Sequence, residues 1–220
     1  MKRETPSHSL AGQQPILLTL PGLNNSGPAH WQSLWEEKRD DCFRIDLGMW
    51  ERPHRNTWLS KLDAAVGSAS APVILVAHSL GCHAVAWWSR LAARQNTEKV
   101  AGALLVAPPN VEQLSQGSPL AAFAPLVRDR LAFPSILAAS RNDDYASFGH
   151  ARKMARLWGS RLISAGWVGH INADSGLGAW PYGEFLLDRL IRSTIVPPSR
   201  GFSQVPVAAR IRSEEIRLRL

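Results

Sequence analysis

Cysteine is scarce in this sequence, which argues against a disulfide-rich protein and against a cysteine metal site. The chain of 220 residues holds two cysteines, Cys42 and Cys82. Two are too few for a disulfide framework, and their separation does not match the spacing of a cysteine metal site. The histidines are scattered, and no glycine-rich phosphate loop follows an expected strand. We therefore expect the protein to need neither a metal nor an organic cofactor.

Long apolar runs are also missing. No run approaches the ~18 residues that a membrane-spanning helix needs. The first residues, MKRETPSHSLAGQQ, are polar and lack the apolar centre of a signal peptide. Internal repeats and low-complexity blocks are absent as well. We expect a cytoplasmic protein without a membrane span, long enough for one domain with a sizeable core.

Positive charge is in excess, but it is not concentrated in a recognition motif. The net charge is +7, and the segment from Pro197 onward holds five arginines against two glutamates. A basic protein can attract nucleic acid or acidic lipid. The sequence contains no helix-turn-helix, RNP-like or zinc signature. We interpret the arginines as solvated surface charges and expect no nucleic-acid partner.

Short apolar runs alternate with segments of helical periodicity along most of the chain. The expected strands are Pro15–Leu20, Cys42–Asp46, Val73–Ala77, Ala103–Val106, Ser135–Ala139 and Arg161–Ser164. The expected helices are His30–Arg39, Thr57–Val66, Leu80 to about Ala93, His150–Trp158 and Ala179–Arg192. Continuous apolar strands between helices are typical of a parallel sheet buried on both faces. The pattern predicts an α/β domain with an open, mostly parallel sheet of about six strands, flanked by helices on both faces.

One strand ends in a motif that carries chemistry. The expected strand Val73–Ala77 runs directly into Ala77-His78-Ser79-Leu80-Gly81 and then into an apolar helix. This resembles the nucleophile elbow G-x-S-x-G, with alanine at the first small position. A sharp turn of this kind lifts the serine oxygen above the sheet, and the N–H of Leu80 faces a developing oxyanion. The alternative is a serine that merely caps the helix.

A nucleophilic serine needs a histidine base and a carboxylate that orients it. Among the later histidines, His170 follows the last expected strand in a glycine-bounded loop, whereas His83 lies within a helix. Asp143 and Asp144 both follow the expected strand Ser135–Ala139. Because the two are adjacent, their side chains diverge and one of them alone can face His170. The residues by themselves leave that choice open.

Four stretches of the chain resemble a known family. They are LPGLNNSGPAHWQSLWE, LVAHSLGC, ASRNDDY and GHINADSGLGAWPYG. They are similar to the compact serine hydrolases typified by retinoblastoma-binding protein nine and the YdeN-like bacterial proteins, over roughly Pro15 to Arg192. The resemblance implies a small α/β-hydrolase fold without a large lid domain and a Ser-Asp-His triad. It assigns the nucleophile to Ser79, the base to His170 and the acid to Asp143. The family's segment resembles Asn-Asp-Pro-Tyr, and Asp144 replaces its proline in this sequence.

The remaining parts of the expected site follow from the fold. A second oxyanion donor comes from the loop after the first strand, where the N–H of Leu23 is the first candidate and that of Asn24 the second. Trp50 and Trp180 are candidates for lining an acyl pocket. The segment Val111–Phe133 forms either a partial cap over the site or a helix packed against the sheet.

These observations predict a serine hydrolase that cleaves small carboxylic esters, with thioesters and amides as further candidates. Its partner is then a small acyl substrate. The alternative is a catalytically silent binding module with the same fold, and a third hypothesis is an interaction protein that docks through its basic tail. We expect a disordered segment at residues 1–14, the α/β-hydrolase domain at 15–196 and a basic extension at 197–220.

Overall fold

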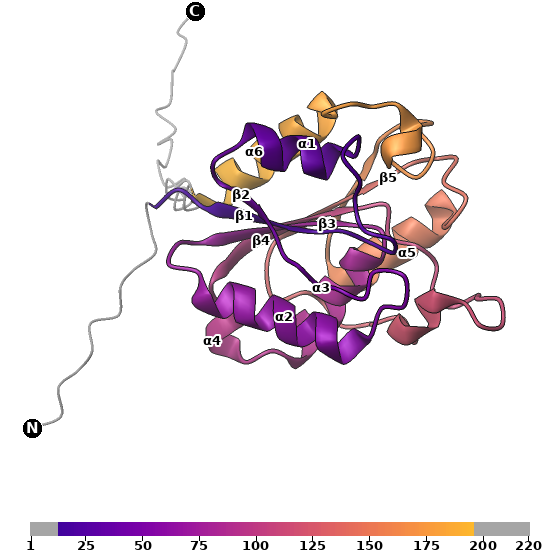
Figure 1. Cartoon of the computed structure of the whole chain (residues 1–220), viewed down its shortest axis with the longest axis horizontal. Helices are drawn as coiled ribbons and strands as arrows, with labels where there is room; N and C mark the ends of the chain where they lie inside the picture. The colour runs from indigo at the N-terminus through magenta and orange to yellow at the C-terminus, as the bar shows by residue number, and fades with distance from the viewer. Residues whose placement is uncertain (1–12, 196–220) are drawn as a thin grey trace, which may run out of the picture.

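A single six-stranded sheet organises the protein. The computed structural model describes residues 13–195. Every neighbouring pair of strands is parallel, and the order across the sheet is β2-β1-β3-β4-β5-β6 (Figure 1). The strands are β1 (Ile16–Leu20), β2 (Cys42–Arg44), β3 (Val73–His78), β4 (Val100–Val106), β5 (Ser135–Ala139) and β6 (Arg161–Ser164). The predicted open parallel sheet and its six strands are confirmed.

Helices cover both faces of the sheet. They are α1 (Trp31–Lys38), α2 (Arg55–Ser68), α3 (Leu80–Leu91), α4 (Arg94–Thr97), α5 (Phe148–Trp158) and α6 (Pro181–Ile195), with 3-10 turns η1 (Pro119–Phe123) and η2 (Ala173–Ser175). Helices α1 and α6 lie on one face of the sheet, and α2, α3 and α5 lie on the other (Figure 1). Their apolar side chains form two separate clusters with the strands. Each face therefore has its own hydrophobic core.

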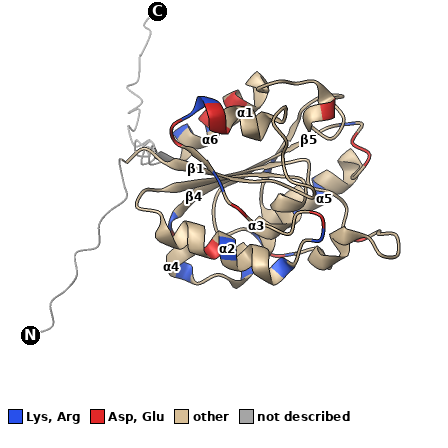
Figure 2. Ribbon diagram, in the orientation of Figure 1, with Lys and Arg blue, Asp and Glu red and all other residues tan. Residues whose placement is uncertain are grey.

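The inner strands carry no charge. No Asp, Glu, Lys or Arg occurs in β1, β3, β4 or β5, and the coloured residues of Figure 2 lie mostly on helices and loops. All six residues of β3 are buried. A strand covered by helices on both sides has no solvent-facing side for polar residues, so its sequence is continuously apolar.

The strand order places the carboxyl end of β1 beside that of β3. From β1 the chain adds β2 on one side, whereas β3 and the later strands extend the sheet on the other side. Such a reversal is a topological switch point, where the loops after two adjacent strands diverge and leave a crevice. The loop that follows Leu20 and the turn at Ser79 both lie at this crevice.

The segment Val111–Phe133 packs against helices through Phe123, and Leu120 of the same segment borders the cavity at Ser79. Phe123 is fully buried, its ring lies 5.3 Å from that of Trp58, and its carbonyl accepts a 2.9 Å hydrogen bond from the Trp87 indole. The ring of Phe123 therefore belongs to the core over α2 and α3.

Two helices differ from the sequence expectations. The short helix α4 was not predicted, because it spans one turn and has no periodic pattern. Helix α2 begins at Arg55, two residues before the expected start at Thr57, and His54 is its N-cap.

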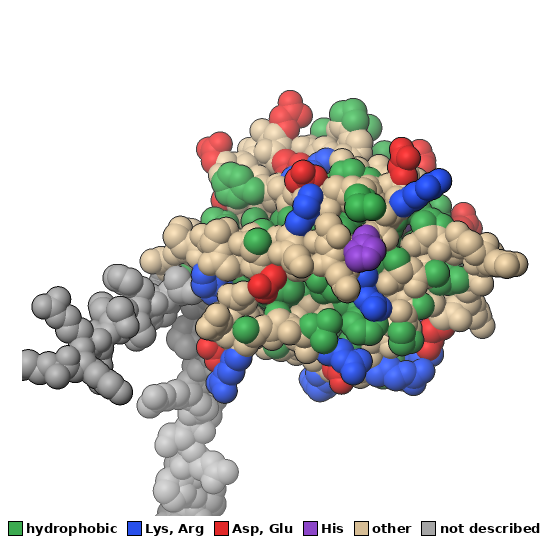
Figure 3. Space-filling model, turned by 60° about the horizontal axis from the view of Figure 1, so that its bottom comes forward, with side chains coloured by type: hydrophobic (Ala, Val, Ile, Leu, Met, Phe, Trp, Pro, Cys, Tyr) green, Lys and Arg blue, Asp and Glu red, His purple; other side chains and the backbone are tan. Residues whose placement is uncertain are grey.

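The surface in Figure 3 shows acidic, basic and apolar side chains interspersed over one face of the molecule. Within residues 13–195, no helix has both the length and the apolar character that a bilayer crossing needs. The expected segments 1–14 and 197–220 lie largely or wholly outside the described residues, so their boundaries stay predictions.

Candidate active site

The turn after β3 has the geometry of a nucleophile elbow. Ser79 is the one residue between β3 and α3, and its φ of 52° and ψ of −123° are unfavourable for a residue with a side chain. Gly81 allows the turn to pass close to β1, because a Cβ there would lie 2.3 Å from the carbonyl oxygen of Leu20. The sharp turn therefore depends on two features. Ser79 adopts a strained backbone conformation, and Gly81 has no Cβ that would meet β1.

Replacing Gly81 by alanine should destabilise the protein by about 3 kcal/mol, because the new methyl group meets rigid backbone atoms of β1. Gly67→Ala is the matched control, since a Cβ there makes ordinary contacts with Asn96. Urea unfolding of the two variants checks the expectation. Equal midpoints for both variants would mean that β1 and α3 are less closely packed than the structure shows.

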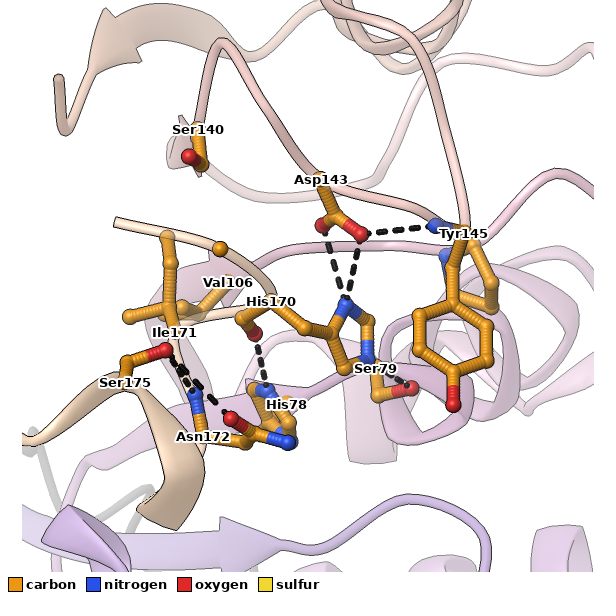
Figure 4. A network of polar contacts seen from close by, with 12 residues as sticks. His78, Ser79, Val106, Ser140, Asp143, Tyr145, His170, Ile171, Asn172 and Ser175 are labelled. Carbon is orange, nitrogen blue, oxygen red and sulfur yellow. Dashed lines mark hydrogen bonds and ion pairs between the residues drawn. The ribbon is translucent and has the colours of Figure 1, made fainter. Parts of the chain in front are cut away.

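The side chains of Ser79, His170 and Asp143 form a hydrogen-bonded chain (Figure 4). The Oγ of Ser79 lies 2.9 Å from Nε2 of His170, and Nδ1 of His170 lies 2.9 Å from each oxygen of Asp143. Asp143 also accepts a 2.9 Å hydrogen bond from the N–H of Tyr145. A carboxylate at Nδ1 holds the imidazole proton there, which leaves Nε2 as the acceptor for the serine hydroxyl.

This geometry bears on the alternatives that the sequence left open. Ser79 makes no side-chain capping bond at the start of α3, so its hydroxyl is committed to His170 rather than to the helix. The Asp143 side chain is 3% exposed beside His170, whereas Asp144 is exposed to solvent. His83 lies away from this group, buried in α3, and its Nε2–H donates to the carbonyl of Pro109 at 2.8 Å.

The loop that carries His170 is held by contacts from two other elements. His78 donates from Nε2 to the carbonyl of His170 at 3.0 Å, and the Trp31 indole donates to the carbonyl of Ile171 at 2.8 Å. These bonds connect the loop to β3 and α1. The imidazole of His170 is thereby fixed relative to Ser79, which is the condition for a productive nucleophile–base contact.

A second set of contacts, which sequence reasoning missed, joins the Asp143 loop to the His170 loop. Ser140 Oγ accepts a 3.0 Å hydrogen bond from the N–H of Val168 and donates to Oδ1 of Asn142 at 2.8 Å. The same oxygen of Asn142 accepts from the N–H of Gly169 at 3.0 Å. Ser140 and Asn142 therefore set the spacing of the two loops. Both residues stand between the end of β5 and Asp143, and this position in the sequence was the available indication of their role.

Asn142→Ala should lower catalytic turnover by about 10- to 100-fold, because a small displacement of His170 from Ser79 disrupts proton transfer. Arg141→Ala is the control, because the N–H of Arg141 keeps its 2.8 Å bond to the Gly166 carbonyl without the side chain. Steady-state kinetics of both variants test this. Equal activities would show that the loops stay in place without the Asn142 contact.

The surroundings of Ser79 bear on the two oxyanion donors expected from the sequence. Leu80 is the first residue of α3, so its N–H has no carbonyl partner within that helix. Gly22 packs directly against Ser79, since a Cβ there would lie 3.1 Å from both Leu80 N and Ser79 Oγ. The residue after Gly22 is Leu23, the first predicted donor. The second, Asn24, already donates its N–H to the carbonyl of Trp50 at 2.9 Å.

Ser79 and His170 open into a cavity of about 320 Å³. It is lined by residues of the loop 23–30, by Leu120 and Tyr145, and by residues of the segment 170–174. The two tryptophans proposed for an acyl pocket do not line it. Trp180 is 3% exposed and packs against tryptophans of α1, while Trp50 packs against Trp58. Trp180 had been considered for an acyl pocket because it lies in a loop, but a loop residue can be buried in the core.

Two further histidines border the cavity, and sequence reasoning gave neither a role. His78 is 5% exposed and His30 is 4% exposed, with their rings 4.7 Å apart. Burial lowers the pKa of His30 to about 4, with nearby Arg44 as a smaller cause, and burial also lowers the pKa of His78 well below its usual value. Both rings are therefore neutral near pH 7.

The buried histidines predict a loss of stability in acid. Burial lowers the pKa of His83 to about 4, like that of His30, whereas both titrate near 6.5 in the unfolded chain. Between these values the unfolded chain binds more protons, so stability is complete above about pH 6.5 and falls towards about pH 4. Each residue contributes up to about 3 kcal/mol to this loss.

Chemical unfolding of the protein and of His83→Gln at several pH values measures this effect. The variant should lose less stability between about pH 6.5 and pH 4, because it has one buried imidazole fewer to charge. Parallel pH curves for the two proteins would show that His83 does not contribute to acid sensitivity.

A family comparison identifies the class of the protein. A family model described as "Serine hydrolase" matches residues 17–189. The chain belongs to the serine hydrolase family. This serine hydrolase is similar in structure to a YdeN-like hydrolase from Pectobacterium atrosepticum, with 30% identity and a TM-score of 0.72, covering 84% of this chain and 94% of that one. The resemblance to YdeN-like proteins predicted from sequence is thereby confirmed.

More distant structures share the fold. The ydeN gene product of Bacillus subtilis is 20% identical with a TM-score of 0.67, and the match covers 81% of this chain and 100% of that one. Est1E from Butyrivibrio proteoclasticus is 13% identical with a TM-score of 0.58, covering 80% and 88%. No match was found among curated proteins. The α/β-hydrolase fold predicted from the sequence is confirmed, and the protein is a hydrolase.

Proposed function

We propose that this hydrolase cleaves small carboxylic esters through an acyl-enzyme intermediate on Ser79. The observation that carries the proposal is the hydrogen-bonded chain from Ser79 through His170 to Asp143 at the wall of a cavity. A serine hydroxyl is a weak nucleophile unless a base removes its proton during attack. The three side chains supply a nucleophile, a base and a carboxylate that fixes the tautomer of the base.

In the first half of the reaction, Ser79 Oγ attacks the ester carbonyl while Nε2 of His170 accepts the hydroxyl proton. The carbonyl oxygen becomes an oxyanion, which the N–H groups of Leu23 and Leu80 stabilise. His170 then protonates the leaving alcohol as the ester bond breaks, and the acyl group stays on Ser79. Asp143 stabilises the transient imidazolium without taking its proton.

In the second half, a water molecule attacks the acyl-enzyme carbonyl. His170 accepts a proton from that water and returns it to Ser79 Oγ, which releases the carboxylic acid. No further group is required for this acyl transfer, so we propose that turnover is independent of metal. Treatment with a chelator should leave the rate unchanged, and recovery of a lost rate by zinc would contradict this part of the proposal.

The size of the cavity bears on the substrate. About 320 Å³ lies near the lower end of the range for ligand sites, so we propose short acyl groups. A series of p-nitrophenyl esters from acetate to octanoate tests both reaction and size. We expect kcat/KM to be highest for acyl chains of about two to four carbons and to fall for longer ones. Absence of hydrolysis across the series, with thioester and anilide analogues included, would favour the silent binding module.

A further inference from the structure

The residues that line the cavity at Ser79 carry a negative charge. Asp174, in the turn η2, lines the cavity and is exposed to solvent. Asn172, which also lines the cavity, donates from Nδ2 to Oδ2 of Asp174 at 3.3 Å. Within residues 13–195, neither lysine nor arginine lines this cavity. A carboxylate therefore borders the cavity, and no cationic side chain of the lining balances it.

The other polar groups near the cavity do not offset this charge. Arg44 donates from Nη1 to Oδ1 of the lining residue Asn25 at 3.2 Å, but it also forms an ion pair with Glu36 at 2.8 Å. The lining histidines His30 and His78 have a lowered pKa because they are buried, so both rings are uncharged near pH 7. A ligand in the cavity therefore meets a field that favours positive charge.

The ring of Tyr145 is a second feature of the lining. The residue is 54% exposed, and its ring lies 4.3 Å from that of His170 (Figure 4). Its N–H donates to Asp143 at 2.9 Å, which ties its backbone to the loop of that carboxylate. The face of an aromatic ring is electronegative and attracts a cationic group within about 6 Å. Ring and carboxylate therefore favour the same kind of ligand.

The chemistry of the proposed reaction indicates which part of the substrate comes near this ring. The leaving alcohol receives its proton from Nε2 of His170, so its oxygen must lie next to that imidazole. Tyr145 is the cavity residue whose ring packs against the same imidazole. The attraction of Asp174 extends over several ångströms, so it acts on a charged alcohol without direct contact.

We propose that the preferred substrates are short-chain esters of an alcohol that bears an ammonium group. Tyr145 offers its ring to that group, and Asp174 supplies the attracting charge. This inference rests on the proposed function, because it requires acylation at Ser79. It narrows the substrate class, since an ester with a carboxylate in its alcohol part would be repelled by Asp174.

Two esters of nearly equal shape isolate the charge. Acetylcholine and 3,3-dimethylbutyl acetate share the acetyl group, and a quaternary nitrogen in the first replaces a quaternary carbon in the second. The nitrogen also changes the intrinsic reactivity, so the ratio of kcat/KM values is compared with the ratio of hydroxide-catalysed rates at the same salt concentration. We expect the enzyme to favour acetylcholine by about tenfold beyond that chemical ratio at low salt, and by about threefold in about 1 M NaCl.

Variants separate the charge of Asp174 from the ring of Tyr145. Asp174→Asn keeps an oxygen that can accept from Asn172 but removes the charge, so the preference should fall by about threefold and lose most of its salt dependence. Asp188→Asn is the control, because Asp188 is exposed on α6 and does not line the cavity. Tyr145→Leu should lower the preference by about two- to fivefold, whereas Tyr145→Phe keeps a ring and should retain it.

The outcomes distinguish this inference from the proposed function. A wild-type ratio equal to the hydroxide ratio, or equal preferences in Asp174→Asn and Asp188→Asn, overturns the inference while ester hydrolysis stands. The wild-type ratio and its salt dependence need no variant, so they decide even if a substitution prevents folding. Rejection of acetylcholine by an enzyme that hydrolyses p-nitrophenyl acetate also overturns the inference. Failure of a fluorophosphonate to label Ser79 overturns the proposed function itself.

Discussion

Ser79→Ala should lower ester turnover by roughly 10³- to 10⁶-fold while leaving the protein folded. The hydroxyl that is removed forms a 2.9 Å hydrogen bond to Nε2 of His170, the one bond of this side chain within residues 13–195. Its loss leaves no atom that can form the acyl-enzyme, so only binding and the oxyanion donors still accelerate the reaction. Kinetics with a p-nitrophenyl ester, together with the circular dichroism spectrum, check the two halves of this expectation.

The control for this variant is Ser68→Ala at the end of α2. Its hydroxyl bonds to the carbonyl of Ala65 at an exposed position and has no contact with the cavity. The control should keep turnover within about twofold of the wild-type rate. Near wild-type hydrolysis by a folded Ser79→Ala protein would show that another residue is the nucleophile.

Asp143→Asn should lower turnover by about 10³- to 10⁴-fold, whereas Asp144→Asn should change it by less than about twofold. The Asp143 carboxylate holds the proton on Nδ1 of His170 at 2.9 Å, and an amide no longer favours that tautomer. Asp144 is exposed and follows Asp143 directly, so its substitution preserves the loop. Kinetics of the pair compare the same chemical change at adjacent positions.

Comparing the Asp143 and Asp144 variants separates the effect of a nearby charge from the effect of direct contact with His170. Both substitutions remove one negative charge from the same loop. If Asp144→Asn proves the more damaging variant, the acid has been assigned one residue too early. Equal, small effects would mean that His170 needs no carboxylate partner in the rate-limiting step.

The elbow could be predicted from the sequence because each of its requirements is local. A buried strand between helices needs a continuous apolar run, which β3 has, and a sharp turn needs a small residue at Gly81. These features depend on neighbours in sequence. The strand order, which brings β1 beside β3, is a finding of the structure.

The choice between Asp143 and Asp144 could not be made from local pattern. The two residues have the same chemistry and the same strand behind them, and they differ in the direction of the side chain. The family resemblance favoured Asp143, and the structure places that carboxylate against His170. A direction set by backbone geometry in a loop leaves no trace in composition or periodicity.

His30 and Asn142 could not be found from the sequence for a related reason. Each makes contacts with residues far away in the chain, such as His30 with His78 and Asn142 with Gly169. A lone histidine before a helix indicates a cap at most. Its place beside the same cavity as Ser79 arises because the loop after β1 and the turn after β3 meet at the same edge of the sheet.

The central claim is that Ser79 is a nucleophile activated by His170, and covalent labelling tests it most directly. A fluorophosphonate reacts with an activated serine and leaves an adduct that peptide mass spectrometry can locate. We predict a single adduct on the peptide that contains Ser79, absent in Ser79→Ala and formed far more slowly in His170→Ala. An adduct on a different serine, or no adduct on the folded wild-type protein, would contradict the account.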